Sequence, residues 1–274
     1  MLNEIAKDNR QPNFITVVNQ KGGVGKTTTV LNLATCLSAV GKKVLIIDLD
    51  AQGNASTGLG ISQEERVRST YDLIVNEDKI SSIVKKTKIP NLSIVPANSD
   101  LSSVDIDLVH KDQKAMRLNM LFTKELYNRD EYDYVFMDCP PALNLITVNS
   151  LVAARMVVIP LQTEFFALEG LSQLMVTIKE IRNTLNNKLR ILGVLLTMFD
   201  KRNNLSIQIE EDVRSTLNDL VFGTMIPRNV KLSEAPSFSI PGVIYDQKCM
   251  GSVAYQKLAA EFLKREKIIL SPNS

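Results

Sequence analysis

The chain has 274 residues, of which 45% are hydrophobic and 23% charged, as is ordinary for a globular protein with a sizeable core. Its net charge of +2 does not predict nucleic-acid binding from bulk electrostatics, so any basic surface must be local. A single histidine and three widely spaced cysteines argue against a metal centre built from these residue types. No apolar run reaches the roughly 18 residues of a membrane span, and residues 1–11 do not resemble a signal peptide, so we expect a cytoplasmic protein.

Apolar runs and amphipathic segments alternate along the chain, which favours an α/β fold. The apolar runs are continuous, as in strands buried on both faces, so we expect a mostly parallel, doubly wound sheet with helices on both faces. We expect one domain over residues 13–267, with tails at 1–12 and 268–274, and a polar loop at 50–60. The predicted strands are 14–18, 44–49, 92–95, 134–137, 156–159 (ended by Pro160), 191–197 and 221–226. The predicted helices are 29–40, 115–127, 168–185, 206–217 and 251–267.

A glycine-rich segment joins the first predicted strand to the first predicted helix. A strand, a glycine-rich turn and Gly-Lys-Thr at a helix start are the context that a phosphate-binding P-loop requires. Glycines let successive backbone N–H groups point at phosphate oxygens, and the helix N-terminus adds partial positive charge. Gln20 stands where the usual pattern has glycine, and an additional lysine comes next. The segment is Asn19-Gln20-Lys21-Gly22-Gly23-Val24-Gly25-Lys26-Thr27-Thr28.

Acidic residues end two other predicted strands, at the sheet edge where the P-loop is expected. Asp48 and Asp50 are two positions apart, so both carboxylates can face one pocket, where one supports the Mg²⁺ region and the other orients an attacking water. Asp138 ends an apolar strand, which is the Walker B arrangement that holds Mg²⁺, usually through a water. Together with the P-loop, these acids predict nucleotide hydrolysis.

The same segments resemble those of a known family. Residues 21–28 match the deviant Walker A motif, in which a lysine precedes the glycines, and residues 48–54 resemble the second motif of that group. The match is to ParA/Soj-type ATPases, which partition chromosomes and plasmids, and it covers the chain from about Phe14 to Phe262. The later segments that support it are 136–141, 164–171, 193–198 and 226–237.

This resemblance implies an ATPase that holds ATP and Mg²⁺ between two copies of the chain. Lys26 and the backbone from Gly22 to Thr28 would bind the phosphates, Thr27 would ligate Mg²⁺, and Lys21 would reach the partner copy's nucleotide. The remaining roles that it implies are a water-activating Asp50, a switch-linked Asp48, the Walker B acid Asp138, and a base-lining segment of Pro227, Arg228 and Asn229. The residues expected to act in catalysis are Lys21, Lys26 and Asp50.

The family also binds DNA through basic residues of the assembled dimer, and Arg202 and Lys231 match those positions. Phosphate contacts do not select a sequence, so such binding should be non-specific and weaken steeply with salt. The resemblance further implies a nucleoid-associated protein with a ParB-like centromere-binding partner. Two residues depart from the family pattern: Ala51 replaces a frequent proline, and Arg155 stands where an acid is common, which suggests altered regulation near the switch.

Three other hypotheses are weaker. A MinD-like division-site ATPase would need an amphipathic membrane helix at its C-terminus, but residues 262–270 include Glu266 and precede a polar tail, so we expect no membrane contact. A carrier of the nitrogenase iron-protein kind needs paired cysteines, and Cys139 has no second cysteine at ligand spacing. A non-enzymatic scaffold is disfavoured because the expected nucleotide-site residues are intact.

Overall fold

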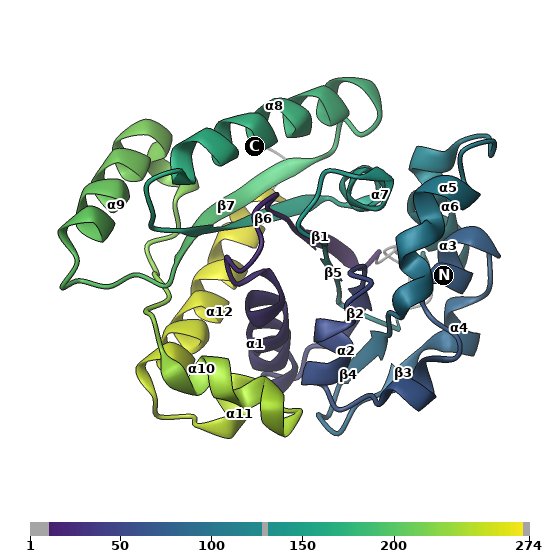
Figure 1. The fold of residues 1–274 in the computed structure, drawn as a ribbon, viewed down its shortest axis with the longest axis horizontal. Helices are drawn as coiled ribbons and strands as arrows, with labels where there is room; N and C mark the ends of the chain where they lie inside the picture. The colour runs from purple at the N-terminus through teal and green to yellow at the C-terminus, as the bar shows by residue number, and fades with distance from the viewer. Residues whose placement is uncertain (1–10, 128–130, 271–274) are drawn as a thin grey trace, which may run out of the picture.

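A computed structural model describes residues 11–127 and 131–270 of the chain. These form a seven-stranded sheet in the order β3-β4-β2-β5-β1-β6-β7 (Figure 1). All neighbouring strands are parallel except β3 and β4, which confirms the predicted fold class. The strands are β1 (Asn13–Val17), β2 (Val44–Asp48), β3 (Lys85–Lys86), β4 (Leu92–Val95), β5 (Tyr134–Asp138), β6 (Met156–Gln162) and β7 (Arg190–Thr197).

Helices cover both faces of the sheet (Figure 1). Buried side chains between the sheet and these helices form two hydrophobic cores. One core joins the sheet to α1 and α12, and the other joins it to α6, α7 and α8. The helices are α1 (Lys26–Ala39), α2 (Asn54–Gly58), α3 (Thr70–Val75), α4 (Ile80–Ile83), α5 (Val104–Asp107), α6 (Arg117–Glu125), α7 (Leu145–Ala153), α8 (Ala167–Thr184), α9 (Asn204–Leu217), α10 (Val230–Glu234), α11 (Gly242–Tyr245) and α12 (Met250–Ile269).

The prediction that Pro160 ends its strand is wrong, because β6 continues to Gln162. The carbonyl oxygen of Pro160 accepts a hydrogen bond from Asn19 Nδ2, so this edge of the residue faces the end of β1. β1 stops at Val17, whose register partner in β6 is Val158, so position 160 lies beyond the end of the β1–β6 ladder. Proline is therefore tolerated in the middle of the sheet at this one register position.

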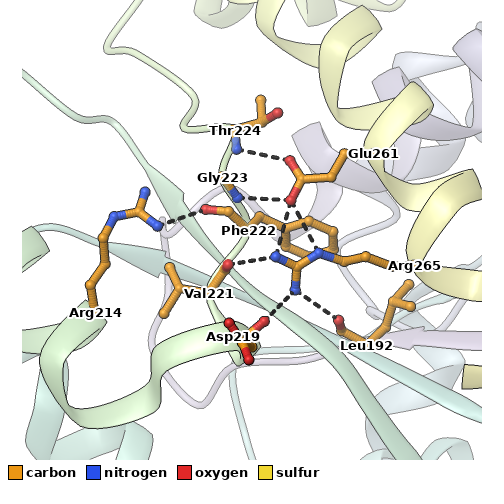
Figure 2. A network of polar contacts seen from close by, with 9 residues as sticks. All are labelled: Leu192, Arg214, Asp219, Val221, Phe222, Gly223, Thr224, Glu261 and Arg265. Atoms are coloured by element: carbon orange, nitrogen blue, oxygen red, sulfur yellow. Dashed lines mark hydrogen bonds and ion pairs between the residues drawn. The ribbon is translucent and has the colours of Figure 1, made fainter. Parts of the chain in front are cut away.

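The predicted strand 221–226 is also absent, and only Val221 forms an isolated bridge, with Val194. The backbone N–H groups of Gly223 and Thr224 donate instead to the Glu261 carboxylate of α12, at 2.8 and 2.9 Å (Figure 2). Arg265 of α12 donates to the Val221 carbonyl at 2.6 Å and pairs with Glu261. The N–H groups of Phe222 and Ile226 still donate to β7, but the side-chain network on α12 takes the hydrogen bonds between them and interrupts the strand.

The predicted loop 50–60 contains α2, and short helical segments occupy stretches where we expected no element. Gly53, with a φ of 62°, is the N-cap residue that precedes α2. Arg66, which is 5% exposed, donates to the carbonyl oxygens of Gly53 and Ile61 and to the Thr57 hydroxyl. A buried guanidinium therefore stabilises this turn, and neither local propensity nor hydrophobic period predicts such a contact.

We expect Gly193→Ala to lower the free energy of unfolding by about 1–3 kcal/mol, measured by thermal or denaturant unfolding. A Cβ at position 193 would lie 2.6 and 2.8 Å from ring atoms of the fully buried Phe222, which already carries the Arg265 guanidinium on its face. The matched control is Gly170→Ala in α8, where a Cβ meets nothing within 4 Å. There the higher helix propensity of alanine should raise the free energy of unfolding by about 0.5–1 kcal/mol. Equal effects of the two substitutions would contradict this packing argument.

Candidate nucleotide site

The glycine-rich segment forms a tight loop at the carboxyl edge of the sheet, between β1 and α1. Gly23 and Gly25 have φ angles of 75° and 87°, a left-handed conformation that side chains disfavour. The Asn19 side chain ties the loop to β6, since its Oδ1 accepts from the Lys21 N–H at 3.0 Å and its Nδ2 donates to the Pro160 carbonyl. A glycine loop of this conformation at a helix N-terminus is the backbone context in which N–H groups can bind phosphate.

A cavity of about 440 Å³ opens above this loop. It brings together most of the residues expected to bind phosphate, together with Asp50, while Val24 is buried and does not line it. Its far wall comes from the segments that follow β2, β5 and β7, as expected at the carboxyl edge of a parallel sheet. The lining residues are Gly22, Gly23, Gly25, Lys26, Thr27, Thr28, Leu31, Asn32, Asp50, Gln52, Asn54, Thr57, Pro141, Met198, Leu232, Pro236, Ile240, Pro241 and Gly242.

Lys26 is 7% exposed and its Nζ donates to the Lys21 carbonyl oxygen at 2.9 Å. Burial lowers the pKa of this amine, and the nearby Asp138 opposes that shift. A buried ammonium held beside the loop is suited to a ligand whose negative charge replaces the lost hydration.

The Asp138 carboxylate is completely buried, and both of its oxygens lack a hydrogen-bond partner among the described residues. Burial raises the pKa of this group well above the usual range, and the neighbouring Asp48 raises it further, while Thr27 and Lys26 act in the opposite direction. Unpartnered buried carboxylate oxygens beside a hydroxyl are a donor set that fits Mg²⁺, either directly or through water. Thr27 and Asp138 are therefore the residues here that could hold the ion.

Asp48 does not share the cavity with Asp50. β2 ends at Asp48, so strand alternation does not extend to position 50, and the completely buried Asp48 carboxylate accepts from the N–H and hydroxyl of Ser56 at 2.9 and 2.6 Å. Burial raises the pKa of Asp48 to about 6 despite these bonds. Asp48 thus ties β2 to α2, whereas Asp50 lines the cavity and its Oδ1 accepts from the Gln52 N–H.

In protein free of nucleotide and Mg²⁺, we expect Asp138→Asn to raise the free energy of unfolding by about 1–3 kcal/mol at pH 8. The folded-state pKa of Asp138 is raised, so the folded protein keeps a proton that the unfolded chain releases, and wild-type stability falls as pH rises above about 4. The gain from asparagine should therefore vanish near pH 4. Denaturant titrations at both pH values measure it, with the exposed Asp212→Asn as control. An asparagine variant less stable than wild type at pH 8 would contradict the argument.

Lys21 behaves differently from Lys26. Its ammonium does not line the cavity but forms an ion pair with Glu164, beyond the end of β6, and its side chain is 48% exposed. Of the two P-loop lysines, Lys26 therefore lines the cavity of its own chain, whereas Lys21 lies at the rim, outside the cavity lining.

Comparisons with known proteins agree with this arrangement. A family described as "AAA domain" matches residues 12–191. "Chromosome partitioning protein ParA" of Caulobacter vibrioides is 50% identical over 253 residues, covering 92% of this chain and 94% of that protein. "Sporulation initiation inhibitor protein Soj" of Bacillus subtilis is 47% identical over 248 residues, covering 90% and 97%. The chain belongs to the ParA/Soj family of partitioning ATPases.

Solved structures related to this ParA/Soj member share its fold. A cobyrinic acid a,c-diamide synthase from Mycobacterium smegmatis, with bound ATP analogue and magnesium, has a TM-score of 0.82 and 31% identity, covering 93% of this chain and 96% of that one. The septum site-determining protein MinD from Pyrococcus horikoshii, complexed with Mg-ADP, has a TM-score of 0.77 and 25% identity, covering 95% and 99%.

The expected base-lining segment of this ParA/Soj member lies beside the cavity without forming its wall. Pro227 forms an isolated β-bridge with Phe199, just beyond β7, and Arg228 donates its N–H to the Phe199 carbonyl. Asn229 caps α10, where its Oδ1 accepts from the Lys231 and Leu232 N–H groups. The cavity wall here is formed by Met198 and Leu232, on either side of the segment.

Both expected DNA-contacting residues are exposed but paired within the chain. Arg202 makes two hydrogen bonds to the Asp200 carboxylate, at 3.0 and 2.9 Å. Lys231 pairs with Glu234 at 2.9 Å. Exposed pairs of this kind contribute at most about 1 kcal/mol, so phosphate groups can compete for these cations.

One expectation about Arg155 is wrong. It lies at the amino end of β6, where its N–H donates to the carbonyl oxygen of Phe14 at the start of β1. This is the sheet edge opposite the P-loop, so Arg155 is not near the switch. The sequence pattern does not predict the supporting roles of Arg66 and Ser56, because side-chain contacts within a turn leave no periodic pattern. It indicates Glu164 only within the segment 164–171, because the pair with Lys21 joins segments distant in the chain.

Proposed function

We propose that this protein dimerises on binding ATP, that the dimer binds DNA without sequence preference, and that hydrolysis releases it. The observation that carries the proposal is the division between the two P-loop lysines. Lys26 is buried beside the cavity, whereas Lys21 is half-exposed at its rim, where a second copy could reach it. A half-exposed cation that does not line the cavity of its own chain is suited to another chain's nucleotide.

In the ATP-bound chain, the backbone of residues 22–28 and Lys26 would hold the phosphates. Thr27 and Asp138 would hold Mg²⁺, which neutralises charge on the phosphate oxygens. Asp50, at the cavity wall, would accept the proton of the attacking water. The Pro227–Asn229 segment would contact the base, and Lys21 would stabilise charge on the partner copy's nucleotide.

On the dimer, Arg202 and Lys231 would exchange their carboxylate partners for DNA phosphates. Each such contact releases counterions from DNA, so binding should weaken steeply with salt and ignore sequence. A ParB-like protein bound at a centromere would stimulate hydrolysis and so release the dimer there, which makes the protein a nucleoid-associated location switch. Slow hydrolysis by the protein alone follows, because the switch must persist in its ATP state.

A MinD-like membrane function has less support. The apolar face of α12 is already covered, since Phe262 is fully buried and its ring packs against Tyr134 and Phe136. Within residues 11–127 and 131–270, no helix is both long and apolar enough to span a bilayer. Polar residues 271–274 and the tail before residue 11 lie outside the described residues.

The proposal is tested by retention on non-specific DNA with ATP or ADP across a salt series. We expect retention with ATP only, and a fall of about 10³-fold or more in affinity between 50 and 200 mM salt if six or more phosphates are contacted. Arg202→Ala and Lys231→Ala should each reduce by about one the steepness with which the logarithm of the DNA-binding constant falls against the logarithm of salt concentration. Lys188→Ala, at an exposed lysine elsewhere on the surface, is the control. ATP-dependent binding to liposomes but not to DNA would move the conclusion to the MinD-like function.

A further inference from the structure

The turn between β6 and α8 presents two adjacent phenylalanines to solvent. Phe165 and Phe166 are 76% and 63% exposed, the highest values among the described phenylalanines, and their rings meet edge to face at 5.1 Å between centroids. Single exposed apolar side chains are common on protein surfaces, but a contiguous aromatic pair marks an interaction site more often.

The turn is anchored on both sides, so these rings are held outward. The buried Thr163 hydroxyl lies 2.6 Å from the Ser206 hydroxyl of α9, a contact that does not depend on the ion pair between Glu164 and Lys21. The Ala167 N–H donates to the Glu164 carbonyl at 2.9 Å and closes the turn. A surface fixed before binding loses little conformational entropy when a partner covers it.

The position of the turn identifies its partner. Through Glu164 it touches Lys21, the residue that the proposed function directs toward a second copy. We propose that Phe165 and Phe166 form the apolar centre of the ATP-dependent interface between two copies of this chain, a role that rests on the proposed function. Stable interfaces combine a desolvated aromatic core with charged contacts around it, and a two-fold interface uses the same turn twice.

A single-tryptophan reporter tests this directly, because the chain contains no tryptophan. Phe165→Trp is titrated with a non-hydrolysable ATP analogue and Mg²⁺, while light scattering records the mass in the same samples. We expect the emission to shift to shorter wavelength in proportion to the dimer, with a midpoint that moves with protein concentration, and no shift with ADP. Dimers whose emission remains that of an exposed tryptophan would overturn the inference, as would a shift that appears only when DNA is added to dimers already formed.

Truncation gives an independent measure. The double variant Phe165→Ala/Phe166→Ala should weaken ATP-dependent dimerisation at least about tenfold while the monomer's affinity for the ATP analogue changes by less than about twofold. Val176→Ala, 58% exposed on α8, is the matched control and should leave both unchanged. Dimerisation of the double variant at wild-type affinity refutes the inference and leaves the proposed function standing. A wild-type protein that never dimerises refutes the proposed function itself.

Discussion

Asp50→Ala should lower the rate of ATP hydrolysis by about 10²–10⁴-fold while leaving ATP binding nearly unchanged. A positioned proton acceptor contributes a factor of this size, and Asp50 is the carboxylate that lines the cavity. Asp48 cannot substitute for it, because its carboxylate is completely buried, with Oδ2 accepting two hydrogen bonds from Ser56 and Oδ1 accepting one from the Asp50 N–H. Single-turnover hydrolysis and ATP affinity, measured on the same preparations, separate the chemical step from binding.

The matched control is Asp50→Asn. The Asp50 Oδ1 accepts a hydrogen bond from the Gln52 N–H at 3.0 Å, and asparagine can keep that bond but cannot accept a proton from water. If Asp50 acts as the base, both variants should be equally slow. Hydrolysis restored by asparagine would show that residue 50 acts by holding the turn through its hydrogen bond with the Gln52 N–H, and not as a base. Because neither variant releases its nucleotide by hydrolysis, both should remain on DNA with ATP, and this retention should still weaken with salt.

The phosphate-binding half of the site could be predicted from sequence because its parts are local. Strand, glycine turn and helix follow one another within residues 13–39, and each has a distinct signal in composition or period. Asp138 was also predictable, since an acid directly after an apolar run falls at the same sheet edge in any parallel arrangement.

The far wall of the cavity could not be predicted, because it depends on contacts between distant segments. Gly242 lets α11 lie close to both α1 and α10. Asn32 of α1 accepts the Val243 N–H at 2.8 Å, and a Cβ at 242 would lie 2.4 Å from Leu232 of α10. The helices here have four or five residues, too few to show a hydrophobic period. The prediction that Asp48 and Asp50 face one pocket failed for a related reason. Residues two apart share a face only within a strand, and the sequence does not show that β2 ends at Asp48.

Lys21→Gln should abolish ATP-dependent dimerisation and DNA retention while the monomer still binds ATP. The Lys21 backbone accepts from Lys26 and donates to Asn19, and the substitution leaves both bonds in place, so the P-loop of the same chain should remain intact. Losing a desolvated ammonium–phosphate contact costs about 2 kcal/mol or more, or about 30-fold, and a two-fold interface loses two. We therefore expect the dimer to weaken by about 10³-fold. Glu164→Gln removes the partner that holds Lys21 within its own chain and should leave dimerisation intact or strengthen it.

Mixing two inactive variants decides whether Lys21 acts on its own nucleotide or on the other copy's. By the proposed roles, a Lys21→Gln chain should bind ATP but lacks the rim lysine, and a Lys26→Gln chain keeps Lys21 but lacks the lysine that lines the cavity. If Lys21 acts across the interface, their mixed dimer has one complete site, and the mixture should hydrolyse ATP faster than either variant alone. If Lys21 acts within its own chain, neither site is complete and mixing restores nothing. Restored hydrolysis should depend on the concentrations of both chains, because the active species contains one of each.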